Sequence, residues 1–370
     1  MVRIERADSR AAVREFVSYP YRKYKGDPNW VAPLRISQHE LLDENKNPFW
    51  QHARRTLYLA KRNGKTVGRV ALIDDDRHNQ THGDDLVFFG FFEADDEEAA
   101  GALYAAIEEG ARALGRKAVR GPANPTMNDG AGFQINAFDE KPYVMMPQSP
   151  PPYPGWAEAA GYKKAKDLFA FHMPNPGHAP ERLQRIANRA RERYKPVVRP
   201  ADMKRFAEEV KLLQRIHTAA WEQNWGQVPY TDAEMAHLAS ELKMIVIPEM
   251  ALFLEYQGEP VGVCIAIPDL NQVLAKFNTG RLLPTGIFHL LRLRKTVDRV
   301  RLVMLGVLPE HRHRGFDILL IDEVMRRGAE NGIKEGELGW TLEDNRNINN
   351  AIQATGGVHY KTYRMFQKDL

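Results

Sequence analysis

The stretch RLVMLGVLPEHRHRGFDILL, residues 301–320, joins an apolar run to an amphipathic one through a basic loop. The run up to Leu308 has the aliphatic composition typical of a strand, and apolar side chains recur at helical spacing from Phe316 onward. Gly315, between the two, lets the backbone turn tightly and approach a ligand closely. A strand that leads through such a loop into a helix predicts an α/β unit.

The basic loop itself predicts an anion site. The first amides of a helix have no intrahelical acceptor, and together with the helix dipole they attract negative charge. Arg312 and Arg314 add positive charge beside them, and arginine can hold a phosphate through two hydrogen bonds. These features suit a pyrophosphate better than a single carboxylate, and a basic surface turn is the alternative.

Length and composition favour a soluble, two-domain protein. A chain of 370 residues exceeds one ordinary core, so we expect two domains of roughly 150 to 200 residues each. A single cysteine, Cys264, excludes an intramolecular disulfide framework and a multi-cysteine zinc site, which suits a reducing cytoplasm. No run approaches the roughly 20 apolar residues of a membrane span. We therefore expect a cytoplasmic location.

A repeat supports the two-domain interpretation. Residues 86–115 and 301–332 each read as a strand with a glycine, a polar loop, and a helix that ends on a glycine. Further on, residues 157–171 and 352–366 align without a gap. Two matches in the same order predict two copies of one α/β unit, and chance similarity of apolar patterns is the alternative.

The predicted domains are residues 1–173 and 196–370, joined by a linker and a basic helix at 174–195. Each copy has a hairpin, at 56–73 or 250–267, whose Asn-Gly or Gln-Gly turn joins two β-rich runs. Strands and helices alternate after it and end in a closing strand pair. Three prolines in the polar stretch that follows residue 171 mark the linker.

The copies differ where a ligand site is expected. The first has the acidic loop EADDEEAAG (93–101) where the second has PEHRHRGFD (309–317). It also carries a long loop rich in glycine, proline and asparagine at 121–155, which exceeds a mere connection. The acidic loop at 93–101 and the basic loop at 309–317 therefore cannot bind the same ligand.

At this point the second copy resembles a known family. A strand, the pattern Arg-x-x-Gly-x-[Gly/Ala] at 312–317 and a helix resemble the coenzyme A loop of the GNAT superfamily of acyltransferases. The next strand, Asn345, a helix and the closing residues 358–368 fit as well. The chain is similar in particular to bacterial tandem GNAT proteins, some of which are associated with ceramide synthesis. This implies two mixed, mostly antiparallel sheets flanked by helices, in an α/β (α+β) fold.

The resemblance implies an acyl-CoA-dependent N-acyltransferase, with acyl-CoA or acetyl-CoA as co-substrate and a primary amine as acceptor. Coenzyme A lies between the third and fourth strands of the second copy in this fold, and an exposed backbone amide on the third stabilises the thioester oxyanion. Thr341, Glu343 and Asn345 share one face of a strand by the two-residue period, which makes Glu343 the candidate base and Asn345 a substrate-positioning residue. The candidate coenzyme residues are Leu305, Gly306, Val307, Arg312, His313, Arg314, Gly315, Phe316 and Asp317.

Two residues depart from the family pattern. Asp317 places a carboxylate near the expected phosphates, although acids are favourable early in a helix. Gln353 stands where family members often have a tyrosine that protonates the departing thiolate. Tyr363, or Tyr360, is the candidate replacement, with ring packing as the alternative for each.

The sequence feature that bears on the acceptor is an insertion at 277–301, in which leucines and Phe288 alternate with Arg292, Arg294 and Lys295. Such a segment fits a peripheral membrane contact or the wall of an apolar tunnel, and a helix packed on the other domain is the alternative. It slightly favours a long-chain or sphingoid amine. Asn128 and Asp129, in the long loop, are candidate acceptor contacts or turn caps.

Other functions remain as alternatives. A tandem GNAT fold that has lost its chemistry is an acyl-CoA sensor or an interaction protein. A nucleic-acid partner is not expected, because no reader motif accompanies the arginine-rich segments. No metal is expected either, since His311 and His313 lack further ligands, and the histidines of DRHNQTH (76–82) fit a polar turn between two strands.

Overall fold

The computed structural model describes residues 1–221, 224–283 and 286–370, with the side chains of residues 294 and 295 outside the description. The chain divides into two compact units. Unit 1 contains residues 1–168, 274–289 and 361–370, and unit 2 contains residues 169–273 and 290–360. Unit 1 thus includes the end of the second copy, and unit 2 the last residues of the first. The limits of the copies themselves stay a prediction.

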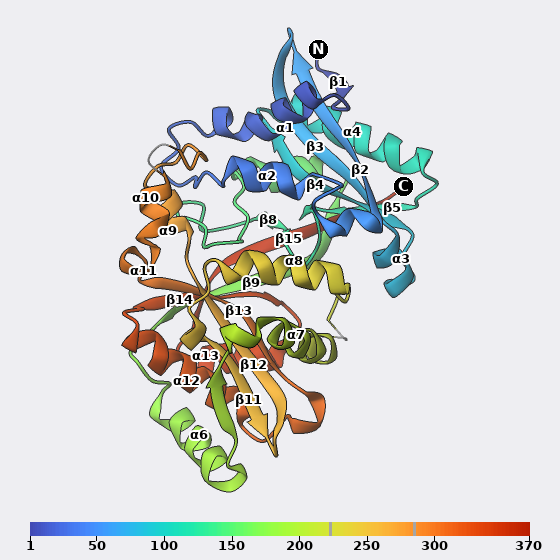
Figure 1. Ribbon diagram of the computed structural model, residues 1–370. Coiled ribbons are helices and arrows are strands. Elements are labelled where there is room, and N and C mark those ends of the chain that lie inside the picture. The colour runs from blue at the N-terminus through green and yellow to red at the C-terminus, as the bar shows by residue number, and fades with distance from the viewer. Residues whose placement is uncertain (222–223, 284–285) are drawn as a thin grey trace. The chain divides into compact units, whose positions relative to one another are not determined.

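Unit 1 is a mixed sheet covered by helices (Figure 1). Its strands follow the order β1-β2-β3-β4-β5-β15, in which β4 and β5 are parallel and the other neighbouring pairs are antiparallel. The elements of the first half are β1 (Arg3–Arg6), α1 (Arg10–Lys23), α2 (Arg35–Leu41), η1 (Pro48–Gln51), β2 (Ala53–Arg62), β3 (Lys65–Asp75), α3 (Asp76–His82), β4 (Leu86–Ala94), α4 (Glu97–Ala113), β5 (Ala118–Gly121), β6 (Ala123–Asn124), β7 (Gly130–Ala131), β8 (Phe133–Gln134), α5 (Pro152–Ala159) and β9 (Lys163–Pro174).

Unit 2 repeats this plan. Its strands follow the order β9-β14-β13-β12-β11-β10, with β13 and β14 parallel and the pairs from β13 to β10 antiparallel. The elements of the second half are α6 (Glu181–Tyr194), β10 (Val197–Pro200), η2 (Met203–Arg205), α7 (Phe206–Trp221), α8 (Asp232–Lys243), η3 (Pro248–Met250), β11 (Ala251–Tyr256), β12 (Glu259–Pro268), α9 (Asn271–Leu274), α10 (Gly286–Leu291), α11 (Leu293–Thr296), β13 (Arg299–Val307), η4 (Pro309–His311), α12 (Phe316–Glu330), β14 (Glu335–Leu342), α13 (Arg346–Ala354) and β15 (Val358–Asp369).

The predicted fold class is therefore confirmed: each unit has a mixed, mostly antiparallel sheet flanked by helices. The predicted hairpins are confirmed too, because β2–β3 and β11–β12 turn at Asn63-Gly64 and Gln257-Gly258 with all four φ angles positive. The prediction that each copy closes with a pair of strands was wrong. Residues 163–174 and 358–369 each form one long strand, since no turn residue interrupts their apolar alternation.

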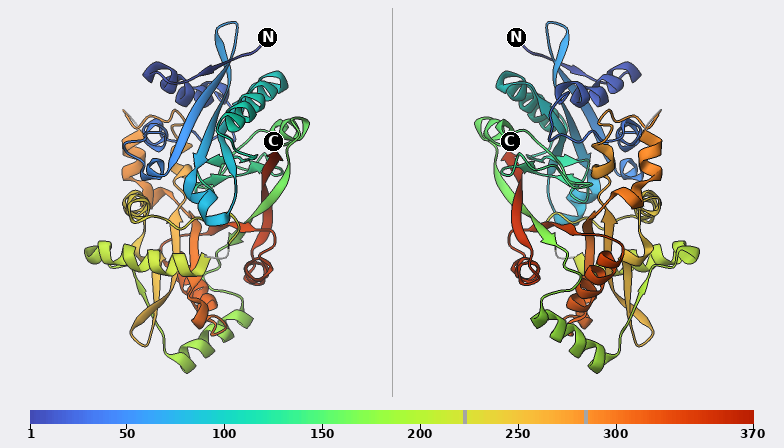
Figure 2. Two further views of the ribbon diagram at one scale, coloured as in Figure 1. Left: turned by 90° about the vertical axis from the view of Figure 1, so that its right-hand side faces the viewer. Right: turned by 90° about the vertical axis from the view of Figure 1, so that its left-hand side faces the viewer.

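Two cores hold the helices in place. In unit 1, Leu103 and Ile107 of α4 pack on β3 and β4 among aromatic rings, and Figure 2 shows α4 lying along that sheet. In unit 2, α12 packs on one face of β11–β13 and on α6, whose Leu183 and Ala187 are buried. α7 contacts β12 and β13. α4 thus begins just after β4, and α12 begins after β13, the fourth strand of each unit.

One segment folds differently from the prediction, and part of another belongs to unit 1. Residues 76–82 form the helix α3, N-capped by Asp75, so the predicted polar turn there was wrong. Residues 274–289, which include the start of the insertion, belong to unit 1, where Asn278 hydrogen-bonds the backbone of Trp30 and Ala32. Residues 284 and 285 of that insertion lie outside the described residues. In the described part of the chain, no helix is both long and apolar enough to cross a bilayer.

Candidate functional site

The ladder between β13 and β14 opens at the place expected for a pantetheine arm. The two strands pair in parallel from Arg299 to Leu302, opposite Glu335 to Leu338, and the register stops there. β13 continues to Val307, paired with β12 on its other side. The edge of β13 that carries Leu305, Gly306 and Val307 therefore borders an opening in the sheet, as the resemblance implies.

The start of α12 lies just beyond this opening. Its N-cap residue, Gly315, has φ +76° and no side chain to satisfy the first helical amides. Phe316 is 1% exposed, so it contributes its backbone amide while its ring packs in the core. Asp317 is exposed to solvent. The helix start thus presents uncapped amides to an anion.

The matching helix start in unit 1 is closed. The carboxylate of Asp96 caps α4 by accepting a hydrogen bond from the Ala99 amide at 3.0 Å. Arg62 pairs with the same carboxylate at 2.7 Å, and this hydrogen bond lowers the pKa of Asp96 to about 2. The acidic loop therefore supplies its own anion, whereas the basic loop of unit 2 leaves that position to a ligand.

The opening in unit 1 is filled as well. β4 and β5 pair only from Leu86 to Phe88, opposite Ala118 to Arg120. Beyond that point, Oδ1 of Asn124 accepts a hydrogen bond from the Phe91 amide at 2.5 Å. A Cβ on Gly90, the counterpart of Gly306, would overlap the Ala123 carbonyl. Protein groups therefore occupy the position that a pantetheine arm would take.

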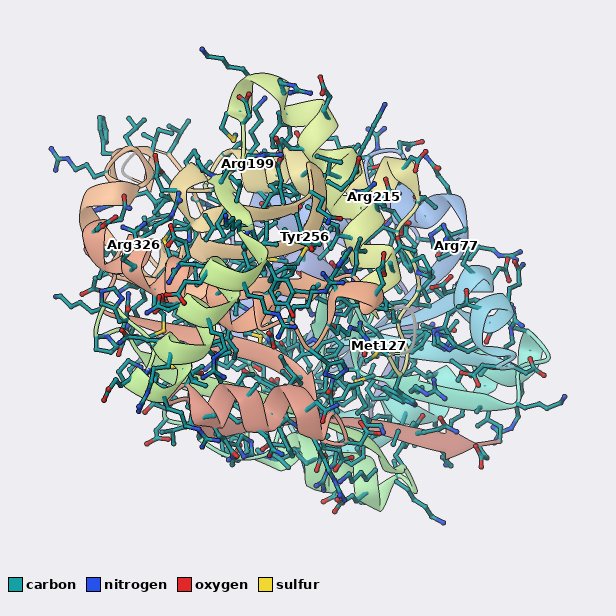
Figure 3. The ribbon with its side chains drawn as sticks, turned by 90° about the horizontal axis from the view of Figure 1, so that it is seen from below. Arg77, Met127, Arg199, Arg215, Tyr256 and Arg326 are labelled. Carbon is teal, nitrogen blue, oxygen red and sulfur yellow. The ribbon has the colours of Figure 1, made fainter. Side chains whose placement is uncertain are left out.

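The two arginines of the basic loop have different surroundings. The Arg314 guanidinium lies over the rings of Tyr194 and Tyr256, at 5.3 and 5.0 Å from their centroids, and Figure 3 labels Tyr256, the last residue of β11. Such contacts hold an arginine in place without using its hydrogen-bond donors. Arg312 donates to the carbonyls of Val307 and Ala220, at 3.4 and 3.1 Å. The two tyrosine rings thus hold Arg314, while Arg312 ties the loop to β13 and α7.

His313 is exposed and has φ +66°, an unusual conformation for a residue with a side chain. Together with Gly315 it bends the loop so that successive backbone amides can face one ligand. Its predicted contribution to coenzyme binding therefore rests on its backbone.

Gly306 makes room for an aromatic ring that the sequence analysis missed. A Cβ at this position would lie 2.5 Å from Cζ3 and 2.7 Å from Cη2 of Trp221, the last residue of α7. The ring of His217, one helical turn earlier, stacks on Trp221 with centroids 4.7 Å apart. The four-residue spacing of His217 and Trp221, which puts both rings on one face of a helix, was the signal in the sequence for this pair.

The predicted strand face of Thr341, Glu343 and Asn345 was wrong. β14 ends at Leu342, and Glu343 lies in the turn that follows, half-buried. Asn345 is the N-cap of α13, where its Oδ1 accepts from the Ile348 amide at 3.4 Å. A helix start so close behind the strand forces the turn. The catalytic roles of Glu343 and Asn345 stay predictions.

Tyr363 and Tyr360 fall in different units. Tyr363 lies in unit 1, fully buried on β15 opposite Gln134 of β8. Tyr360 lies in unit 2 and donates a hydrogen bond to Glu337, a fully buried carboxylate on β14. Unit 2 therefore holds Glu343, Asn345 and Tyr360, and the structure does not group Tyr363 with them. Glu337 is a further polar residue that the sequence analysis missed.

Asn128 and Asp129 form a tight turn in unit 1. The Thr126 hydroxyl donates to Oδ2 of Asp129 at 2.8 Å, and the Asn128 amide donates to that hydroxyl at 3.0 Å. This is the capping arrangement that was the alternative to an acceptor contact. Within residues 1–221, 224–283 and 286–370, no group of three or more metal-ligating side chains is found.

Comparison with known proteins gives close relatives over nearly the whole chain. It is 36% identical over 371 residues to the bacterial ceramide synthase of Caulobacter vibrioides, covering 97% of this chain and 95% of that protein. It is 32% identical over 367 residues to protein YghO of Escherichia coli, covering 97% and 93%. The structure of a tandem GNAT protein from the clavulanic acid biosynthesis pathway superposes with a TM-score of 0.57 at 12% identity, covering 100% of this chain and 98% of that one. No family model matches the sequence.

Proposed function

Because this chain belongs to the family of tandem GNAT acyltransferases that contains the bacterial ceramide synthase, we propose that it transfers a long acyl group from coenzyme A to the primary amine of a sphingoid-like lipid. The observation that carries this proposal is the contrast between the two helix starts. Gly315 leaves the start of α12 open beside the gap between β13 and β14, whereas Asp96 closes the start of α4.

Coenzyme A fits unit 2 through groups of known geometry. Its pyrophosphate suits the uncapped amides at the start of α12, with Arg314 beside them. Its pantetheine arm suits the free edge of β13 at Leu305, Gly306 and Val307. In the described residues of unit 1, Asp96 caps the matching helix start and Asn124 bonds the matching strand, so we propose one coenzyme on each chain, in unit 2.

The proposed reaction is direct attack within a ternary complex. The amine must first lose a proton, and Glu343 is the candidate base. The nitrogen of the acceptor amine then bonds to the thioester carbon, while a backbone amide of β13 near Gly306 stabilises the oxyanion. The carbon–sulfur bond breaks, and the sulfur leaves as a thiolate that takes up a proton. Asn345 is the candidate for positioning the acceptor.

A lipid-like acceptor is supported by exposed apolar side chains in unit 1. Leu283 and Phe288 of the insertion are 74% and 64% exposed, and Ile36 of α2 is 56% exposed. Arg35, next to Ile36, donates its amide to the Gly280 carbonyl, which links α2 to the insertion. Large exposed apolar residues with arginines nearby are typical of surfaces that contact a membrane. We therefore propose a cytoplasmic protein that rests on the inner membrane surface.

A second candidate function is an acyl-CoA sensor without catalysis. Gln353 favours it, because an amide cannot protonate a thiolate. The two functions differ in whether acyl-CoA binding leads to thiol release.

Thiol release separates them. The protein is mixed with acyl-CoA of graded chain length and with sphinganine, a short alkylamine or a lysine peptide, and free thiol and acylated product are measured by dye and by mass spectrometry. We expect thiol and product in equal amounts with sphinganine and a long-chain acyl-CoA. Binding of acyl-CoA without thiol release across the panel would establish the sensor. Preference for the peptide would contradict the lipid acceptor.

A further inference from the structure

Helix α6, which lies between the two copies in the sequence, carries arginines on its solvent face. Four of them are exposed: Arg182, Arg185, Arg189 and Arg193. Arg182, Arg189 and Arg193 share one face, because spacings of seven and four residues are close to whole helical turns. Arg185 has a partner on its own helix, since its guanidinium lies 3.8 Å from the Glu181 carboxylate. The proposed reaction gives this basic face no role.

This helix borders the candidate coenzyme site. α6 packs against α12, and both helices belong to unit 2 (Figure 1). A Cβ added to Gly315 would lie 3.0 Å from Cγ2 of Ile186 and 3.7 Å from Cβ of Ala190. Ile186 is itself 38% exposed, so this contact lies at the edge of the face that carries the arginines. Side chains on that face of α6 can therefore reach a group bound at the start of α12.

Tyr194 brings the last of these arginines next to the basic loop. The Arg193 guanidinium lies 5.2 Å from the centroid of the Tyr194 ring, and the Arg314 guanidinium lies 5.3 Å from the same centroid. The ring also packs edge-on against Phe316, the first residue of α12, with centroids 5.7 Å apart. Arg189 lies one turn before Arg193 on the same face. Two arginines of α6 thus lie beside the arginine proposed for the pyrophosphate.

Protein carboxylates do not neutralise these two arginines. Among the described residues, neither Arg189 nor Arg193 forms an ion pair, whereas Arg191 binds Asp322 at 3.1 Å. Glu192 lies about 100° round the helix from Arg193. Like charges four residues apart on a helix repel each other, and a bound anion relieves that repulsion. The pair is therefore suited to a phosphate, which offers several negative oxygens.

We propose that Arg189 and Arg193 bind the ribose 3′-phosphate of coenzyme A. This inference rests on the proposed function, from which it takes the coenzyme. Coenzyme A carries its negative charge in two places, the pyrophosphate and the 3′-phosphate, which lie a few bonds apart on the adenosine. The uncapped amides of α12 and Arg314 suit the pyrophosphate. The 3′-phosphate is a monoester with a charge of about −1.5 to −2 near pH 7, which two arginines can balance.

An anionic lipid headgroup has the same chemistry, but the position of the arginines favours the coenzyme. The contact of α6 with Gly315 and the shared Tyr194 ring place them at the coenzyme loop. All residues of α6 are described, and Ile186 is its one exposed apolar side chain. A helix that lies on a membrane exposes a row of apolar side chains.

The test compares coenzyme A with 3′-dephospho-coenzyme A, which keeps the pyrophosphate and lacks the 3′-phosphate. Calorimetry gives the Kd of both for wild type and for the double variant Arg189→Gln with Arg193→Gln. The matched control is Arg182→Gln with Arg185→Gln, which removes the same charge from the same helix. All four side chains are exposed, so the substitutions leave the core intact.

We expect wild type and the control to bind coenzyme A about tenfold more tightly than the dephospho form. This is the low end for charge-assisted hydrogen bonds, because the arginines are exposed. In the double variant the ratio should fall to about twofold or less. Its Kd for the dephospho form should stay within about threefold of wild type, since the pyrophosphate contacts remain.

Two results in solution overturn the assignment. One is equal binding of the two coenzymes by wild type. The other is a double variant that loses affinity for both coenzymes by the same factor, because the arginines would then act on the pyrophosphate or through overall charge. Vesicles that contain phosphatidylglycerol test the lipid alternative. If the double variant loses vesicle binding and keeps the tenfold ratio, the arginines serve anionic lipid and the assignment is wrong.

The proposed function fails in a different way. A wild type that shows the tenfold ratio, lost in the double variant, but releases no thiol with any amine retains the 3′-phosphate site and loses the acyl transfer. A wild type that binds neither coenzyme loses both.

Discussion

Gly306→Ala is a sharp perturbation of the candidate site because one methyl group must enter an occupied position. The added Cβ would lie 2.5 Å from Cζ3 of Trp221, and nonbonded carbons prefer about 3.5–4.0 Å. Trp221 or β13 must therefore shift by about 1 Å. A displacement of this size in a reacting assembly can lower kcat/KM about 10²-fold, which is roughly 2.7 kcal/mol in transition-state free energy. Crowding also lowers stability by about 1–3 kcal/mol.

The assay is continuous detection of released coenzyme A with a long-chain acyl-CoA and sphinganine, alongside thermal unfolding. The matched control is Gly262→Ala, on the neighbouring strand β12. Its Cβ would meet Cδ1 of Leu320 at 3.2 Å, the end of a flexible side chain that can give way. We expect its kcat/KM within about threefold of wild type. If Gly306→Ala has the kcat/KM of wild type and its tryptophan fluorescence is unchanged, the reasoning is refuted.

Four further outcomes are expected. Arg314→Gln should raise the Kd for acyl-CoA about 10-fold to 100-fold by calorimetry, since a charge-assisted hydrogen bond contributes about 1.5–3 kcal/mol, and an unchanged Kd rules out the phosphate contact. Glu343→Gln should lower kcat about 10²-fold near neutral pH, and normal turnover from acid to alkaline pH removes Glu343 as the base. His217 and His78 have pKa values of about 4 in the folded protein, below the unfolded value near 6.5, so the free energy of unfolding is greatest above pH 6.5 and falls as the pH drops toward 4. Urea titrations at pH 7.5 and 5.5 should differ by about 1 kcal/mol per histidine, and His217→Phe should remove one share; the same slope in that variant contradicts its titration. Gly101→Ala, exposed on α4 with nothing within 4 Å of its added Cβ, should raise the unfolding free energy by about 0.5–1 kcal/mol at unchanged turnover, and a lower melting temperature would count against the helix.

Local patterns made much of the fold predictable from the sequence. Asn63-Gly64 and Gln257-Gly258 fix two-residue turns, because few other residues accept two successive positive φ angles. Gly315 marks the start of α12 for the same reason. The strand and helix around the basic loop were readable because each buries one face with its own period.

Contacts distant in sequence were not predictable in this way. Residues 361–370 carry the same alternation whether they pair within their own copy or with β5, and the structure pairs Phe366 with Gly121. Trp221 is far from Gly306 in the sequence, and only the folded chain shows that its ring lies against this glycine. Asn345 suited both a strand end and a helix cap, and the cap decided where β14 stops.

Unit 1 cannot be completed until the end of the chain has been synthesised, because it contains residues 361–370. Residues 1–168 leave the ribosome early, but the strand segment Lys361–Leu370 that pairs with β5 is made some two hundred residues later. The edge of β5 must wait through the synthesis of unit 2 with unpaired backbone groups, a state in which strands readily join wrong partners. Slow translation of the second half or a blocked C-terminal strand would therefore harm the unit encoded first.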